Sequence, residues 1–561
     1  MRIYLLILSL AYTTGCISQV LTINVSENNF GIDENRSLIV SRIQNISNYE
    51  DTSNYDEIVI TLGQNYYSFI SIPNSLEYSS SYVVSDVNSS SQYTLYFSSL
   101  PLISINTDNT IVNEPKVLAE FTYSDDEQTV ASNIGIELRG GYSQSFSKKT
   151  YDIEFWDDEI GDETIDVQFG ELRQDDDWIL DALYNEPLRL RSYTANKLWK
   201  ELHTPYYIDN EPNAKSGADV MYVEIFLNEQ YNGLYNLSEQ ADRKQLKVKK
   251  FNGDMRGELY KAYDWGGANT FDSLPSYNNN IREWGGYKVK YPDEDELTDW
   301  ENLYEFTSFV MNSSESEFAY SIWSEFSEDN FIDYFLFLNL IHAPDNTGKN
   351  IYLAKYNVDE PYFYVPWDLD GCFGTKWDGT NLNITDDILS NGFIDRVWAE
   401  NPNSIFTTIA DNWFDYRNDI FSNNSLSQSI TQQYEFFQEN KIYERESLVY
   451  PNYSFDNPSL SYTLDWLDSR LEYLDIYFGD ILSVNSLTPA NKLSIYPNPA
   501  IDKIYISSIK NLNGNSYKIY NNIGQLITTG VIENEQIKIE RLEIGIYLIL
   551  INGNTYKLIK N

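Results

Sequence analysis

The sequence predicts a multidomain protein in which an all-β N-terminal domain, an α+β central domain and a small all-β C-terminal domain follow one another. The length of 561 residues fits roughly three to four domains at the usual ~150 residues each. Apolar residues make up 42 % of the chain and aromatic residues 15 %, which is enough for several cores and argues against a disordered chain. The residue pattern changes near residues 116 and 492, and these changes set the predicted domain boundaries.

The chain is strongly acidic, with 39 Lys and Arg against 84 Asp and Glu and a formal net charge of −45. This charge opposes binding to nucleic acid and to anionic lipid, and it suits a protein that handles divalent metal or lives in salty water. The two histidines, His203 and His342, exclude a histidine-rich zinc site and leave little room for a hydrolytic triad. Any catalysis must therefore rely on carboxylates.

Residues 1–18 have the layout of a secretory signal peptide, with Arg2 before a short apolar run and small or polar residues after it. We expect cleavage before Gln19, although Cys16 allows a second interpretation as a lipid-attachment cysteine. The cleaved chain would keep Cys372 as its one cysteine, which excludes an intramolecular disulfide. No later stretch reaches the ~18 apolar residues of a membrane helix, so we expect a soluble or surface-attached product.

Residues 19–115 are predicted to form an all-β lead-in domain. Apolar and polar residues alternate in several short runs, such as residues 57–62 and 93–97. No group of residues here forms a site, so a role as a spacer or an adhesive module remains open.

Residues 116–480 form the predicted central domain, in which strands mix with helices. The first predicted elements are strands over 134–140 and 148–155, a helix over 187–202, and a hairpin of strands over 222–227 and 231–237. Strand, strand, helix, strand, strand is the order of elements in the small lobe of a protein kinase.

Two kinds of basic residue in this region are candidates for binding a phosphate. Alternation along the strand over 148–155 places Lys149 on the same face as the apolar residues Tyr151, Ile153 and Phe155. A lysine that points inward needs a charged partner, which is either a carboxylate of the small lobe or a bound phosphate. Arg139 and Arg191 are either ion pairs that hold the fold, the interpretation we favour, or contacts to a phosphate-bearing cofactor.

Acidic residues stand at both ends of a β-hairpin that follows a predicted helix over 330–342. Asp345 and Asn350 are five residues apart, as are the Asp and Asn of the kinase catalytic loop, and Asp368 ends the returning strand. One carboxylate can deprotonate an acceptor hydroxyl while an Asn oxygen and a second carboxylate hold Mg²⁺. Asp370 is a second metal ligand or a cap. A structural Ca²⁺ or turn-stabilising role for the group remains the alternative, but Pro366 rules out an EF-hand.

A series of motifs in one order carries a family resemblance over about residues 100–478. The motifs are Leu102-Ile-Ser-Ile-Asn106, Leu138-Arg-Gly140, Phe146-Ser-Lys-Lys-Thr-Tyr151, Asp177-Trp-Ile-Leu180, Leu190-Arg191, Val223-Glu-Ile-Phe-Leu-Asn228, Tyr231-Asn-Gly-Leu-Tyr235 with Glu239, Asn330-Phe-Ile-Asp-Tyr334, Asp345-Asn-Thr-Gly-Lys-Asn350 and Pro366-Trp-Asp-Leu-Asp-Gly-Cys-Phe-Gly374. In these motifs the chain resembles the CotH kinase-like proteins, a family named for a spore-coat protein and related in fold to atypical secreted kinases.

The resemblance implies a bilobal, protein-kinase-like fold for the central domain and specific roles for its residues. Asp345 would be the catalytic aspartate, and Asn350 and Asp368 would be metal ligands. Lys149 would bind the phosphates of the nucleotide, and Glu239 would lie near the hinge that binds the adenine ring. The implied cofactors are ATP and Mg²⁺ or Mn²⁺.

The chain departs from the ordinary kinase pattern at three places. Ala343-Pro344 replaces the His-Arg before the catalytic Asp, and no Gly-rich phosphate loop precedes Lys149. The predicted helix over 187–202 lacks a clear Glu facing the lysine, because Glu186 precedes its first turn and Glu201 lies at its end. The partner of the lysine therefore stays unassigned.

Residues 481–491 are predicted to form a linker. Residues 492–561 are predicted to form a small β-sandwich of short strands separated by turns. Its motifs are Ser494-Ile-Tyr-Pro-Asn-Pro-Ala500, Ile519-Tyr-Asn-Asn-Ile-Gly524, Gly545-Ile-Tyr-Leu548 and Tyr556-Lys-Leu-Ile-Lys560. They resemble the C-terminal sorting domain of proteins exported by the type IX secretion system of Bacteroidetes. The resemblance implies the secretion machinery as a partner and passage through the periplasm and outer membrane.

These observations predict an exported atypical kinase that transfers the γ-phosphoryl group of ATP to Ser or Thr hydroxyls of secreted or surface proteins. Two alternatives remain. The kinase fold could be catalytically silent and serve as a structural or binding element of the cell surface. The acidic cleft and the many aromatic residues could instead bind a polysaccharide.

Overall fold

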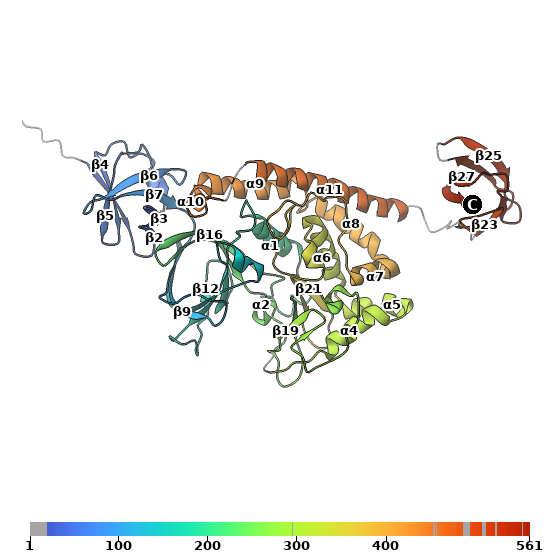
Figure 1. The fold of residues 1–561 in the computed structure, drawn as a ribbon, viewed down its shortest axis with the longest axis horizontal. Coiled ribbons are helices and arrows are strands. Elements are labelled where there is room, and N and C mark those ends of the chain that lie inside the picture. The colour runs from blue at the N-terminus through green and yellow to red at the C-terminus, as the bar shows by residue number, and fades with distance from the viewer. Residues whose placement is uncertain are drawn as a thin grey trace, which may run out of the picture. The chain divides into compact units, whose positions relative to one another are not determined.

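The computed structural model describes residues 19–293, 296–452, 455, 457–485, 494–507, 512–521, 524–551 and 554–561. The predicted signal peptide and residues 486–491 of the predicted linker lie outside this range. The chain divides into two compact units, Met1–Ile476 and Tyr477–Asn561, with the boundary inside the long helix α11 (Figure 1). Among the described residues, no helix combines the length and the apolar character needed to cross a bilayer.

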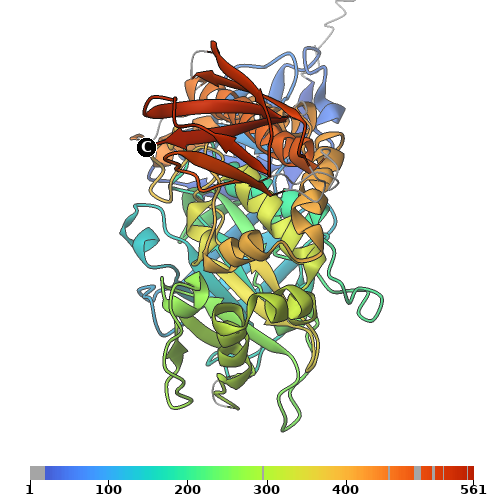
Figure 2. The ribbon, with the colours of Figure 1, turned by 90° about the vertical axis from the view of Figure 1, so that its right-hand side faces the viewer.

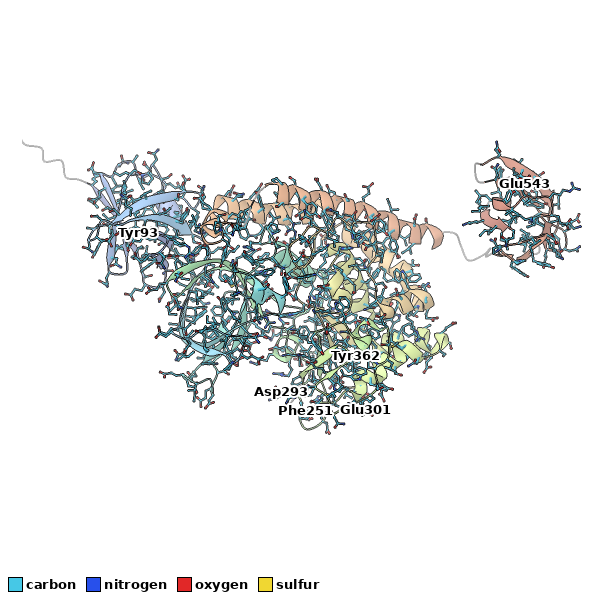
Figure 3. The ribbon with its side chains drawn as sticks, in the orientation of Figure 1. Tyr93, Phe251, Asp293, Glu301, Tyr362 and Glu543 are labelled. Carbon is cyan, nitrogen blue, oxygen red and sulfur yellow. The ribbon has the colours of Figure 1, made fainter. Side chains whose placement is uncertain are left out.

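The chain begins with a seven-stranded mixed sheet in the order β1-β4-β5-β6-β7-β3-β2. Its strands are β1 Val20–Val25, β2 Phe30–Asp33, β3 Leu38–Arg42, β4 Glu57–Leu62, β5 Asn65–Phe69, β6 Ser81–Asp86 and β7 Gln92–Ser98. Alternation explains the burial of Ile58, Ile60 and Leu62 on β4, as the sequence predicts. Tyr93, labelled in Figure 3, packs in this core and donates its hydroxyl to Glu34.

A closed barrel of seven strands follows, in the order β10-β11-β14-β16-β15-β8-β9. Its strands are β8 Leu102–Asn106, β9 Val117–Ser124, β10 Thr129–Leu138, β11 Tyr151–Trp156, β14 Asp177–Asp181, β15 Val220–Leu227 and β16 Gln230–Glu239. Apolar residues from all seven strands fill the interior, among them Phe121, Ile153, Phe155 and Trp178. Between β11 and β15 lie the short ribbon β12 Val167–Gln168 with β13 Gln174–Asp175 and the helix α1 Arg191–Leu202.

The barrel differs from the predicted strand order in three respects. Residues 102–106, placed by the sequence in the lead-in domain, form β8 and pair with β9 and β15. β14 lies between β11 and β16, so the sheet has a strand beyond the predicted pairs. The helix predicted from residue 187 begins at Arg191, because Arg189 has a left-handed backbone (φ 59°) that a helix does not admit.

The second half of the central region is a five-stranded antiparallel sheet surrounded by helices, in the strand order β18-β19-β17-β20-β21. The strands are β17 Glu258–Ala262, β18 Glu283–Trp284, β19 Tyr287–Tyr291, β20 Ile351–Lys355 and β21 Tyr362–Pro366. The helices of eight residues or more are α4 Glu301–Asn312, α5 Glu315–Glu325, α6 Glu328–Ile341, α7 Gly392–Glu400, α8 Ile405–Arg417, α9 Asn423–Glu439, α10 Ile442–Val449 and α11 Asn457–Asn485. α6 packs against β21, where Tyr362, labelled in Figure 3, is fully buried.

The C-terminal module, drawn in red in Figure 2, is all-β. Its two sheets have the orders β22-β23-β26 and β25-β24-β27-β28. The strands are β22 Ser494–Tyr496, β23 Lys503–Ser507, β24 Ser516–Asn521, β25 Leu526–Val531, β26 Gln536–Lys538, β27 Gly545–Ile551 and β28 Asn554–Lys560. Residues from both sheets share one core, which includes Ile504, Ile519 and Ile549.

Candidate functional site

A cavity of about 570 Å³ opens between the barrel and the second sheet. This volume lies in the range of small-molecule sites. Four carboxylates and four cations line it, together with neutral polar and aromatic side chains. The charged residues are Asp181, Asp345, Asp368, Asp370, Arg139, Lys148, Lys261 and Lys349.

One buried amide fixes the loop after α6 to the end of β21. The Asn346 amide nitrogen donates to the carbonyls of Asn350 and Trp367, both at 2.8 Å. The backbone N–H of Trp367 also donates to the Asn350 carbonyl at 3.0 Å. These bonds bring Asp345 and Asn350 beside Asp368, so the predicted trio does share one cavity.

Asn350 and Asp368 both have left-handed backbones, with φ values of 55° and 53°. Asn and Asp tolerate this conformation better than other residues with a side chain, and such conformations concentrate at functional sites. The conformation turns the chain sharply at both ends of the β20–β21 hairpin.

The carboxylates of the cavity repel one another. Burial raises the pKa of Asp345, and the charge of Asp368 raises it further while Lys349 opposes the change. Burial also raises the pKa of Asp370 well above its usual range, with Asp368 and Asp181 adding to the effect. A bound cation would relieve this repulsion.

The donor set fits Mg²⁺ or Mn²⁺. Mg²⁺ is usually held by one or two carboxylates together with substrate phosphates and water, so three converging carboxylates are not required. Asn350, Asp368 and Asp370 supply amide and carboxylate oxygens. In the described part of the chain, the carboxylates that do converge as a trio are Asp166, Asp175 and Asp176, where Lys244 already pairs with Asp175 at 2.8 Å.

The expectation that Lys149 points into the site is wrong. Its ammonium donates to the backbone carbonyls of Gln144 and Phe146, and it does not line the cavity. Lys148 lines the cavity instead and is 1 % exposed. Regular alternation begins at Tyr151, where β11 begins, so it does not extend back to Lys149.

The structure supplies the lysine partner that the sequence left unassigned. The Lys148 ammonium lies 2.6 Å from Glu446 of α10, and Arg189 donates to the same carboxylate oxygen at 3.1 Å. Burial lowers the pKa of Lys148 to about 7, although Glu446 favours the charged form. Glu186 pairs instead with Arg191 at 2.8 Å, which confirms the fold-holding ion pair expected for Arg191.

Glu239 also lies outside the cavity, contrary to its predicted place near an adenine site. It is fully buried, pairs with Lys215, and accepts the Gln245 amide at 2.9 Å and the Arg173 backbone N–H at 2.8 Å. Because side chains alternate along β16, Asn236 and Ser238 face the cavity and Glu239 does not.

Arg139 both forms an ion pair within the barrel and lines the cavity. Its guanidinium lies 2.6 Å from Asp152, the ion pair that the sequence favoured. It also lines the cavity, 5.5 Å from the ring centre of Trp367.

Among the cavity residues that the sequence did not predict are Asp181, Asn236 and Lys261. Asp181 directly follows the motif 177–180 and pairs across the sheet with Asn236. The one feature that could have pointed to Asp181 is its position at the end of a strand. Neither Asn236 nor Lys261 stands in a pattern that singles it out.

Asn236 is 1 % exposed, and within the described ranges of the chain neither its amide nitrogen nor its oxygen has a hydrogen-bond partner. Asn236→Leu should therefore raise the free energy of unfolding of the ligand-free protein by ~1–3 kcal/mol, because it removes a buried unsatisfied group. Urea unfolding measures this change.

The matched control is Asn339→Leu. Asn339 is equally buried, but its amide donates to the Phe335 carbonyl at 3.0 Å and accepts the Leu389 N–H at 2.7 Å. This substitution should destabilise the protein. An equal loss in both variants would show that Asn236 is already satisfied without a ligand.

Comparison with known families gives two matches. The family described as CotH kinase protein matches residues 136–474, which is more than half of the chain. The family described as secretion system C-terminal sorting domain matches residues 494–561. A search of curated proteins gave no match.

Proposed function

The chain belongs to the CotH kinase protein family, and from this premise we propose that it is an atypical protein kinase. The central region would transfer the γ-phosphoryl group of ATP to Ser or Thr hydroxyls of secreted or surface proteins. Mg²⁺ or Mn²⁺ would be required. The barrel with α1 would act as the small lobe, and the sheet β18-β19-β17-β20-β21 with its helices as the large lobe.

The observation that carries this proposal is the shared cavity of Asp345, Asn350 and Asp368. Asp345 is half-buried, and its raised pKa favours taking up the proton of an acceptor hydroxyl. Asn350, Asp368 and Asp370 would hold the metal, which when bound would neutralise charge on the nucleotide phosphates. Lys148, held by Glu446, takes the place proposed from the sequence for Lys149.

The match to a sorting domain supports handling by the type IX secretion system and delivery to the cell surface or beyond. ATP is scarce outside cells, so we place the phosphoryl transfer in the periplasm, during transit.

Label transfer from γ-labelled ATP to casein, with and without Mn²⁺, tests the proposal. Transfer should require Mn²⁺ and should be lost in Asp368→Asn, because an amide binds the metal more weakly than a carboxylate does. Asp378→Asn is the matched control, since Asp378 lies in the following loop with an exposed side chain outside the cavity.

Transfer that survives Asp368→Asn would contradict the metal assignment. If the unaltered chain transfers no label and nucleotide leaves its thermal midpoint unchanged, a silent kinase fold explains the structure better. A shift of the midpoint with glycans alone would favour polysaccharide binding.

A further inference from the structure

The four cations of the cavity differ in whether the protein neutralises them. Arg139 is paired with Asp152, and Lys148 with Glu446. Lys261 and Lys349 make no ion pair or side-chain hydrogen bond within the part of the chain that the structure describes. The charge of Lys349 is partly balanced by Asp345 in the same loop. Asp368 likewise balances part of the charge of Lys261. Among the described residues, both lysines therefore lack a direct ion pair.

Lys261 is held on a regular strand rather than on a loop. It pairs in β17 with Tyr352 of β20 and Lys288 of β19. Its ammonium lies 5.7 Å from the ring centre of Trp367 and 5.8 Å from that of Tyr352. These contacts direct the charge into the cavity, next to the residue that precedes Asp368.

An ammonium without a carboxylate partner in a partly buried wall is costly. Burial lowers the pKa of Lys261 to about 8, and the charge of Arg139 adds to this effect while the charge of Asp368 opposes it. The cost disappears when a ligand brings an anionic group to this wall. A ligand group that contacts both this ammonium and a metal held by nearby carboxylates must carry more than one negative charge. A phosphate group carries enough charge for both contacts.

We propose that Lys261 is the counter-ion of a ligand phosphate group. It would contact a phosphate in addition to Lys148, which takes the place that the sequence predicts for Lys149. This inference deepens the proposed function and rests on it for the identity of the ligand as a nucleotide. It assigns a phosphate contact to the second sheet, across the cavity wall formed by β17.

The test is calorimetric titration of the full chain with Mn²⁺-ATP, adenosine and inorganic tripolyphosphate. Lys261→Met should weaken binding of Mn²⁺-ATP and of tripolyphosphate by about ten- to a hundredfold, the range of a hydrogen bond to a charged group. Adenosine binding should stay within about twofold. Lys261→Arg should recover most of the loss, because it restores the positive charge.

Lys290→Met is the matched control, because Lys290 lies on β19 with an exposed side chain and does not line the cavity. It should leave all three affinities unchanged. The thermal midpoint of Lys261→Met should equal or exceed that of the unaltered chain, which separates lost binding from lost folding.

The inference is overturned if Lys261→Met weakens adenosine as much as ATP, since the lysine would then only pack. It is also overturned if Lys261→Met leaves tripolyphosphate binding unchanged, or if the unaltered chain binds neither anion. Tripolyphosphate binding that depends on Lys261 without any nucleotide binding would support the inference and contradict the nucleotide proposal.

Discussion

Asp345→Asn should lower the rate of phosphoryl transfer by about 10²–10⁴-fold, the contribution of a positioned general base. The amide keeps the size of the side chain but cannot take up the acceptor proton. Affinity for Mn²⁺-ATP should change little, because Asn350 and Asp368 would still hold the metal. Single-turnover transfer and calorimetric titration measure the two quantities separately.

The rate of phosphoryl transfer by the unaltered protein should depend on pH through the protonation of Asp345. Because burial raises the pKa of Asp345, the base becomes active only at a pH above the usual range of an aspartate. The rate should therefore rise with pH through that higher range, and the rise should vanish in Asp345→Asn.

Asp359→Asn is the control for Asp345→Asn, since Asp359 is an exposed residue between β20 and β21. A rate in Asp345→Asn within tenfold of the original would remove Asp345 from the mechanism. Lost nucleotide binding in this variant would make Asp345 a binding residue instead.

Glu446→Gln should lower the free energy of unfolding by about 3–5 kcal/mol, the cost of leaving a buried charge without its partner. Glu446 is fully buried and faces Lys148 and Arg189, and its second oxygen accepts the Leu234 N–H at 3.0 Å. The amide keeps the volume but removes the negative charge from between two cations. Urea unfolding of the full chain, followed by tryptophan fluorescence, measures the loss.

Glu444→Gln on the same helix is the control for Glu446→Gln. Glu444 is exposed and bonds the Tyr96 hydroxyl at 2.8 Å, so its loss should cost less than ~1 kcal/mol. Lys148→Met should cost less in the Glu446→Gln background than in the original chain, because the pair is then already broken. Equal costs in both backgrounds would show that the ion pair does not couple the two residues.

Much of the architecture follows from local patterns in the sequence. Alternation places β4, β7, β15 and β16 within a few residues of their observed bounds, and Pro344 marks the end of α6. Closure of the barrel could not be predicted, because it depends on β8 pairing with β15, about a hundred residues later in the chain. No local pattern encodes such a pairing.

The candidate site was predictable where chemistry and spacing coincide, as at Asp345, Asn350 and Asp368. It was not predictable at Lys148 and Lys149, because the choice between two adjacent lysines depends on where β11 becomes regular. Lys261 was not predictable, because its distinguishing feature is an ammonium that makes no ion pair among the residues that the structure describes, and only the packed structure shows this.

The ion pairs of α10 have a consequence for the order in which the chain folds. Lys148 and Glu446 are 298 residues apart, and Glu224 and Arg445 are 221 apart. In a nascent chain that includes the barrel but not yet α10, Lys148 and Arg189 therefore lack Glu446, their carboxylate partner. Contacts this distant in sequence form late and slow folding. We therefore expect the barrel to stay loosely packed until α10 has been synthesised, which delays compaction of a chain that must still be exported.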